Sequence, residues 1–84
     1  MTLKTNFFVQ AFVPNRGQLK PGKRDLAPSE NGAIKKAEAW AAREKGVAAV
    51  KVTADDETGE VSEAVVLSTH GQVPDDFADQ IKGS

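Results

Sequence analysis

Hydrophobic positions divide the chain into several extended segments and one helical segment. Residues 7–13 read FFVQAFV, so aromatic and β-branched residues occupy both faces of a strand. Because both faces are apolar and Pro14 follows, the pattern predicts a central strand that ends at Val13. Residues 47–54 and 61–69 are also rich in β-branched residues and predict two further strands.

One segment has the spacing of an amphipathic helix, from Ser29 to Lys45. Ser29 can accept a hydrogen bond from a backbone N–H of the first turn, and Gly46 suits a left-handed C-terminal cap. The apolar stripe at helical spacing consists of Ala33, Ile34, Ala37, Trp40 and Ala41. Because most of these side chains are small, we expect the helix to approach a sheet closely.

Glycine, proline and polar residues mark the connections. Residues 15–22 contain proline, glycine, asparagine and basic side chains, and they predict a loop. Residues 23–27 are charged and flanked by prolines, which is typical of a short strand at a sheet edge. Residues 55–60 (DDETGE) predict a hairpin turn in which Gly59 has a positive φ.

The last segment begins at Pro74, a residue favoured in the first turn of a helix. Phe77 and Ile81 lie four residues apart and can share one face of a short helix. We therefore predict a single α+β domain over residues 1–84. It has a three- or four-stranded, mainly antiparallel sheet with one long helix on one face, in the order β-β-α-β-β, and a short C-terminal helix.

One helix cannot cover both apolar faces of the first strand. The second face carries Phe8 and Phe12 and needs a cover of its own. The candidates are Phe77 and Ile81 of the C-terminal segment, or another subunit, as in a homodimer.

Composition excludes several kinds of chemistry. The chain has no cysteine and one histidine, which excludes disulfides, cysteine-bound zinc and a multi-histidine metal site within one chain. Gly17 and Gly22 do not form a phosphate-binding loop, because no lysine–serine pair and no helix follow them. No apolar run reaches the roughly 20 residues of a membrane span, and residues 1–6 lack the apolar core of a signal peptide. We expect no cofactor, no membrane contact and a cytoplasmic location.

Charge is unevenly distributed, although the formal net charge is only −1. Residues 1–27 carry five basic and one acidic side chain, whereas residues 51–84 carry two basic and eight acidic ones. Such asymmetry fits a nucleic-acid contact, an acidic partner, or simple neutralisation across the fold.

The basic side chains make the strongest candidate binding surface. Four of them lie within nine residues, and the exposed helix face adds three more. They could neutralise phosphates, while phenylalanine rings on an open sheet face could stack on bases. The candidate surface consists of Phe8, Phe12, Arg16, Lys20, Lys23, Arg24, Lys35, Lys36 and Arg43. The favoured alternative is that the rings belong to the core or to a dimer interface and that the charges form a solvated surface.

Two further groups carry chemistry. The acidic residues of the 55–60 turn could hold a hard cation, but their spacing does not match an EF-hand, and a solvated hairpin tip is the favoured alternative. His70 could act as a general base, with Ser68 on the same face of the strand, or could be structural.

Several short motifs resemble those of a family of short, uncharacterised bacterial α+β proteins. They are Phe8-Val9-Gln10-Ala11-Phe12, the helix alanines with Glu38, Gly46-Val47, Thr58-Gly59-Glu60, Val65-Val66-Leu67 and Gly71-Gln72-Val73-Pro74. The resemblance implies a compact α+β domain and no particular activity. Val9-Gln10 before an alanine-rich helix also resembles the first half of a SPOR domain, which binds peptidoglycan, although the spacing to the next phenylalanine is shorter here.

Three functions follow from these patterns. The first is a non-enzymatic interaction module, with an unknown protein or a second copy as its partner. The second is single-stranded nucleic-acid binding through the basic loop and helix face. The third is a small enzyme that uses His70.

Overall fold

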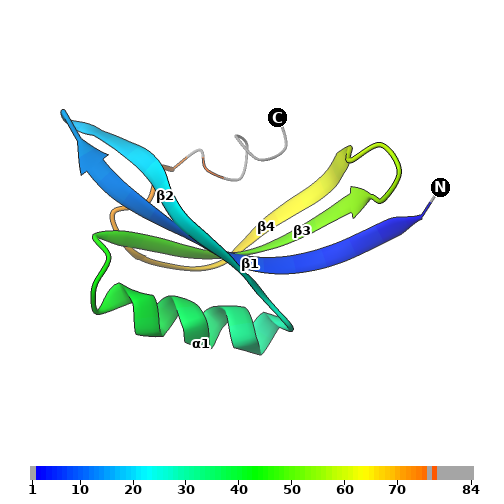
Figure 1. Ribbon diagram of the computed structural model, residues 1–84, viewed down its shortest axis with the longest axis horizontal. Helices are drawn as coiled ribbons and strands as arrows, with labels where there is room; N and C mark the ends of the chain where they lie inside the picture. The colour runs from blue at the N-terminus through cyan, green and yellow to red at the C-terminus, as the bar shows by residue number, and fades with distance from the viewer. Residues whose placement is uncertain (1, 76, 78–84) are drawn as a thin grey trace.

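The computed structural model describes residues 2–75 and 77, which form a four-stranded sheet with one helix packed on it (Figure 1). The elements are β1 (Leu3–Asn15), β2 (Gln18–Ala27), α1 (Glu30–Ala41), β3 (Gly46–Asp55) and β4 (Val61–Gly71). The strands are ordered β2-β1-β3-β4, and every neighbouring pair is antiparallel. This confirms the predicted β-β-α-β-β order, the α+β class and the central position of β1.

The helix covers one face of the sheet. Ser29 caps it by accepting a hydrogen bond from the Gly32 N–H at 3.0 Å. The predicted stripe is the packed one, because Ala33, Ala37 and Trp40 are buried against Val9 and Val47. Small residues on both sides let the helix lie close to the strands, as the sequence predicts.

The opposite face of the sheet has its own apolar cluster. Phe8, Phe12 and Val50 are buried there with Phe77. The rings of Phe12 and Phe77 meet edge to face, with centroids 4.8 Å apart. Phe77 is therefore a cover of this face, as one of the two alternatives proposed. The predicted short C-terminal helix is not seen in the part of the chain that the structure describes, and Ile81 lies outside it.

The prediction of a loop over residues 15–22 is wrong. β1 and β2 are joined by a two-residue turn at Arg16 and Gly17, whose φ angles are 54° and 80°. Positive φ at both positions is typical of the type I′ turn of a hairpin. Pro14 and Pro21 are tolerated inside these strands because β1 pairs with β3 only as far as Phe12, and β2 is an edge strand.

A β-bulge in β2 explains the buried glutamine of β1. Gln10 pairs with Arg24 and Phe12 with Pro21, so β2 has an extra residue between these two pairs. The Gln10 side-chain amide donates to the carbonyls of Gly22 and Lys23, at 3.1 and 3.2 Å. The side chain of Gln10 thus provides hydrogen bonds to backbone carbonyls that the bulge leaves without a partner in β1.

The helix ends earlier than predicted. Its last residue is Ala41 rather than Lys45, and the Trp40 carbonyl accepts hydrogen bonds from the N–H groups of both Arg43 and Glu44. Gly46 is not the left-handed cap but the first residue of β3, opposite Gly71. A glycine is required at this position because the backbone of Gln72 leaves no space for a Cβ atom.

Candidate functional site

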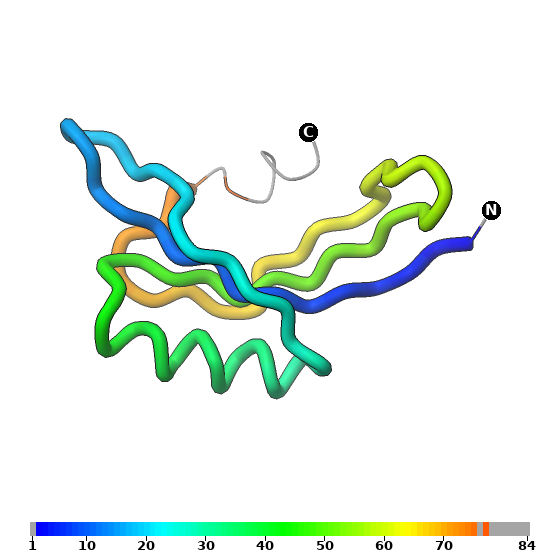
Figure 2. Tube along the Cα trace, viewed as in Figure 1, coloured from blue at the N-terminus to red at the C-terminus, as the bar shows by residue number. Residues whose placement is uncertain are grey.

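The two charged regions of the sequence lie at opposite ends of the molecule. The β1–β2 hairpin and the β3–β4 turn rise at the two ends of the long axis (Figure 2), which measures 40 Å. The first carries Arg16 and Lys20, and the second carries Asp56, Glu57 and Glu60. The fold therefore keeps the hairpin cations away from the acidic turn, although Lys4 of the basic N-terminal region lies 3.8 Å from Asp56 of that turn.

The seven basic residues of the predicted surface do not form one patch. Lys20 and Lys23 lie on the helix side of β2, since Lys20 pairs with Val13 and Lys23 contacts Trp40. Arg16 is at the hairpin tip. Arg24 points to the other face of the sheet, whereas the remaining three are on or just after the helix, namely Lys35, Lys36 and Arg43.

One group of these side chains converges on the helix side. The Lys23 ammonium lies 5.0 Å from the centroid of the Trp40 ring. Lys23, Trp40, Arg43 and Glu44 line a cavity of about 140 Å³ between β2 and the end of α1. Two cations that are twenty residues apart in the sequence therefore share one open pocket, which we call the Lys23–Arg43 pocket.

Lys36 is occupied by an ion pair within the chain. Its ammonium lies 2.9 Å from a carboxylate oxygen of Asp25 and also donates to the Leu26 carbonyl at 3.1 Å. The hydrogen bond and the charge of Lys36 lower the pKa of Asp25 below its usual value of 3.8. This pair ties α1 to β2 and covers part of the edge of β2.

We predict that the Lys36–Asp25 pair makes the fold sensitive to acid. Because the Asp25 pKa is lowered by folding, the pair stabilises the protein above pH 3.8, and this contribution disappears as the pH falls through the folded-state pKa. Carboxyl chemical shifts should place the Asp25 pKa below 3.8, and Lys36→Met should return it toward 3.8. An Asp25 pKa at or above 3.8 in the unmodified protein would contradict the pair.

The phenylalanine platform predicted for base stacking is not exposed. Phe8 is 6% exposed and Phe12 is 1% exposed. The Arg24 guanidinium lies 4.5 Å from the Phe8 ring centroid, and its Nε donates to the Gln10 side chain at 2.8 Å. Both rings are thus core residues of the second face, as in the alternative that the sequence left open, while Arg24 packs over Phe8 and stays exposed.

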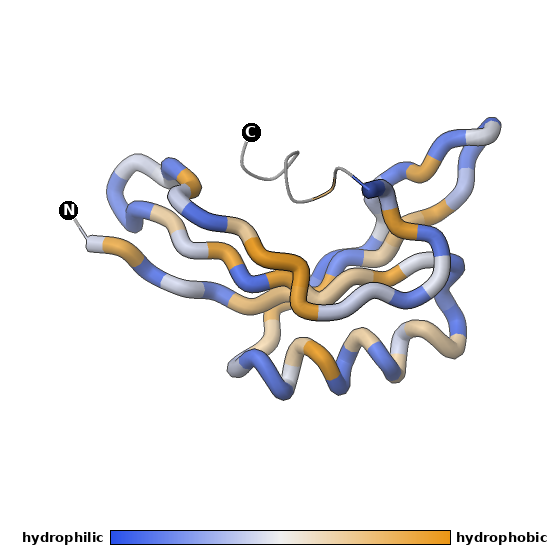
Figure 3. The backbone as a smooth tube through the Cα atoms, turned by 180° about the vertical axis from the view of Figure 1, so that it is seen from behind, coloured by the Kyte–Doolittle hydropathy of each residue, from blue (hydrophilic) through white to orange (hydrophobic). Residues whose placement is uncertain are grey.

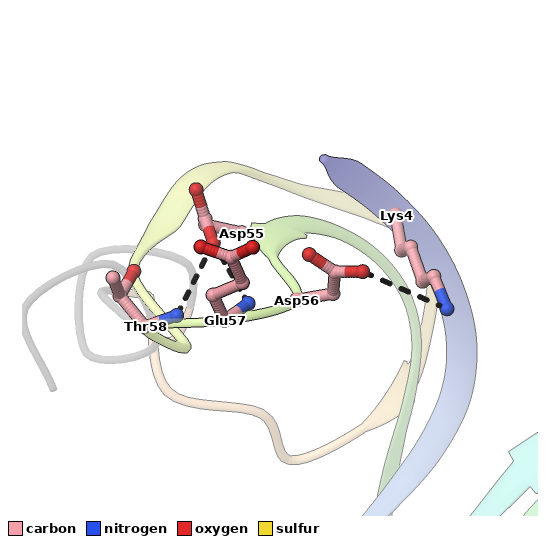
Figure 4. Close-up of polar contacts among 5 residues, drawn as sticks. All are labelled: Lys4, Asp55, Asp56, Glu57 and Thr58. Carbon is pink, nitrogen blue, oxygen red and sulfur yellow. Dashed lines mark hydrogen bonds and ion pairs between the residues drawn. The ribbon is translucent and has the colours of Figure 1, made fainter. Parts of the chain in front are cut away.

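The acidic turn is organised by one of its own carboxylates (Figure 4). Asp55 is buried, and its side chain accepts hydrogen bonds from the N–H groups of Glu57 and Thr58, at 2.8 and 3.2 Å. Lys4 of β1 lies 3.8 Å from Asp56. Gly59 has the predicted positive φ, 76°. Over residues 2–75 and 77, no group of three or more histidine or acidic side chains is placed to hold a metal ion.

His70 and Ser68 lie on the helix-covered face of β4, opposite Val47 and Ala49. His70 Nε2 and Ser68 Oγ are both shielded from solvent and make no hydrogen bond within the described residues. A second cavity, of about 370 Å³, is lined by Val66, Thr69 and Phe77 on the other face. Neither of the two cavities is lined by His70, so no substrate-sized space opens onto it from either of them.

Sequence reasoning missed the pairing of Lys23 with Trp40. The apolar stripe of the helix places Trp40 in the core, and it is 9% exposed. The hairpin of β1 and β2 could have indicated this contact. The helix follows β2 directly and runs back along it, so the C-terminal end of α1 lies beside Lys23.

No helix in the described part of the chain has both the length and the apolar character needed to cross a bilayer. Comparison with known proteins gives no match to any family model, any curated protein or any solved structure.

Proposed function

We propose that this domain is a non-enzymatic interaction module that binds an acidic segment of a protein partner on the helix side of β2. The observation that carries the proposal is the convergence of Lys23 and Arg43 at one pocket beside Trp40. The ion pair of Lys36 with Asp25 holds the helix and the strand that present these cations. The partner would supply carboxylates, which are the natural counterparts of ammonium and guanidinium groups.

An acidic peptide fits this surface better than a single-stranded nucleic acid. Binding of single strands draws on exposed aromatic rings for base stacking, and Phe8, Phe12 and Trp40 are each at most 9% exposed. A long polyanion would also meet the acidic β3–β4 turn and Glu44 in the pocket itself. A short acidic segment does not reach the β3–β4 turn, and it needs only Lys23 and Arg43 as counterparts.

The third alternative, catalysis by His70, has less support. Its Nε2 atom is shielded beneath the helix, and Ser68 Oγ makes no hydrogen bond to it within the described residues. A general base needs the reacting group within hydrogen-bond reach, and a nucleophile is activated through such a bond.

The test is a titration with a short glutamate peptide, followed by backbone amide shifts and repeated with oligo-dT. We expect the glutamate peptide to shift signals around Lys23, Trp40 and Arg43, with an affinity that falls as salt is raised. The double variant Lys23→Gln/Arg43→Gln should weaken binding by about tenfold, since it removes two charged contacts of about 0.5–1 kcal/mol each.

The matched control is Lys4→Gln/Lys51→Gln, which removes the same charge away from the pocket and should leave the affinity unchanged. Thermal melts of both double variants would show that they remain folded. Equal losses in the two double variants would mean non-specific attraction and would reject the pocket. Shifts produced by oligo-dT and not by the short glutamate peptide would instead favour the nucleic-acid alternative.

A further inference from the structure

The two edges of the sheet differ in how they are protected. An exposed edge strand offers unpaired backbone groups to another strand, and proteins block this with prolines, lysines, bulges or covering side chains. β2 has Pro21, a bulge beside Lys23, and Lys36 bonded to the Leu26 carbonyl. Its edge is closed to a further strand.

β4 lacks most of these devices. It is eleven residues long and contains no proline, lysine or arginine. Between Glu63 and His70 it reads AVVLST, an uncharged stretch rich in β-branched residues. Figure 3, in which β4 faces the viewer, shows hydrophobic residues along its middle. Val65 is among the large hydrophobic residues that are exposed, at 39%.

Relative to β3, β4 has two extra residues, Ser62 and Leu67, because the pairing is irregular between Thr53 and Ala54 and between Ala49 and Val50. Leu67 lies inside the uncharged stretch and limits its regular part. Between the two irregularities, Glu63 to Val66 pair in regular register with Thr53 to Val50. A short regular edge therefore remains, centred near Val65.

From these observations we infer that β4 pairs antiparallel with β4 of a second copy of this chain, centred on Val65, to form one continuous eight-stranded sheet. An antiparallel pair has a two-fold axis, so the contact is the same on both copies and closes at a dimer. Val65 would face Val65 of the other copy and lose its exposed surface, and Ala64 would face Val66.

Charge is consistent with this register. The two Glu63 side chains would lie four residues apart along the strands, about 13 Å, which exceeds the screening length of about 8 Å in physiological salt. The acidic β3–β4 turn of each copy would lie beside the far end of the other β4. Lys45 lies at that end, since its carbonyl accepts a hydrogen bond from the Gln72 N–H at 2.9 Å. Lys45 of each copy would thus offset part of the negative charge of the other copy's turn, while Asp75 lies at the same end as Lys45.

The oligomeric state tests this pairing independently of any acidic ligand. Sedimentation of the unmodified chain should show a dimer, and Val65→Lys should give a monomer with an unchanged circular dichroism spectrum, because two like charges would face each other. Leu26→Lys, on the protected β2 edge and more exposed, should leave the dimer intact.

Mixing provides the second measurement. The V65K and V65E variants should each be monomeric alone and should form a heterodimer when mixed, because opposite charges then face each other across the axis. The chain has no cysteine, so Val65→Cys should also cross-link readily under oxidation, whereas Leu26→Cys should not. A monomer at about 1 mM, or equal cross-linking at both positions, would overturn the inference.

Discussion

Replacing Phe12 by alanine is expected to lower the free energy of unfolding by about 3–5 kcal/mol, the usual cost of removing a buried phenylalanine. Phe12 is 1% exposed and is one of the largest fully buried side chains described. Its ring packs edge to face on Phe77, so the variant loses this contact as well as the buried area. Chemical denaturation followed by Trp40 fluorescence measures the change.

The loss would be a large share of the total stability. A chain of 84 residues is expected to have a free energy of unfolding of about 4–12 kcal/mol. Leu26→Ala is the matched control, because Leu26 is 66% exposed on the same face of the sheet and should change the stability by less than about 0.5 kcal/mol. Similar losses in the two variants would mean that Phe77 does not cover this face.

Gly46→Ala is expected to be at least as damaging, by about 3 kcal/mol or more, and can prevent folding altogether. A Cβ atom at Gly46 would lie 1.7 Å from the Gln72 carbonyl oxygen and 2.6 Å from its carbon. Both are backbone atoms, and the Gln72 N–H is bonded to the Lys45 carbonyl, so neither side can move without breaking the end of the β3–β4 ladder.

Gly22→Ala is the control for this substitution. A Cβ at Gly22 would meet Val13 at 3.5 Å, an ordinary contact, so we expect a change within about 1 kcal/mol. Thermal unfolding of the two variants, with circular dichroism to detect a chain that does not fold, distinguishes these expectations. A Gly46→Ala variant as stable as Gly22→Ala would show that Gln72 does not lie against Gly46.

The strands and the helix could be predicted because their signals are local. The apolar residues on both faces of residues 7–13 require a strand with two covered faces, and the structure places β1 in the middle of the sheet with an apolar cluster on each side. The stripe that ends at Trp40 likewise selects one face of α1. Gly59 marks its turn because a left-handed conformation is costly for any other residue type.

The β1–β2 hairpin could not be predicted in the same way. Pro14, Pro21 and Gly22 are strand breakers in a central strand, and they read as a loop in isolation. They are acceptable only because one side of each strand is unpaired at these positions, which depends on the order of strands in the sheet.

The candidate site could likewise be predicted only in part. Its basic residues could be recognised in the sequence, but their grouping could not. The bulge in β2 sends Arg24 to the face of Phe8 and Gln10 while Lys23 contacts Trp40 on the other face. Because side chains alternate along a strand, one extra residue decides which neighbours share a face.

By itself, the sequence determined the long helix, the strands around residues 7–13, 47–54 and 61–69, the two-sided core strand and the absence of thiol chemistry, because each depends on residue identity and short-range spacing. Only the tertiary structure decided that Phe77 covers the second face and that β4 is the less protected edge. It also decided how the basic side chains are grouped, because Lys36 is paired with Asp25 while Lys23 and Arg43 share a pocket. These features depend on contacts between residues distant in the chain. Such contacts follow from strand order and register, which local patterns constrain only weakly.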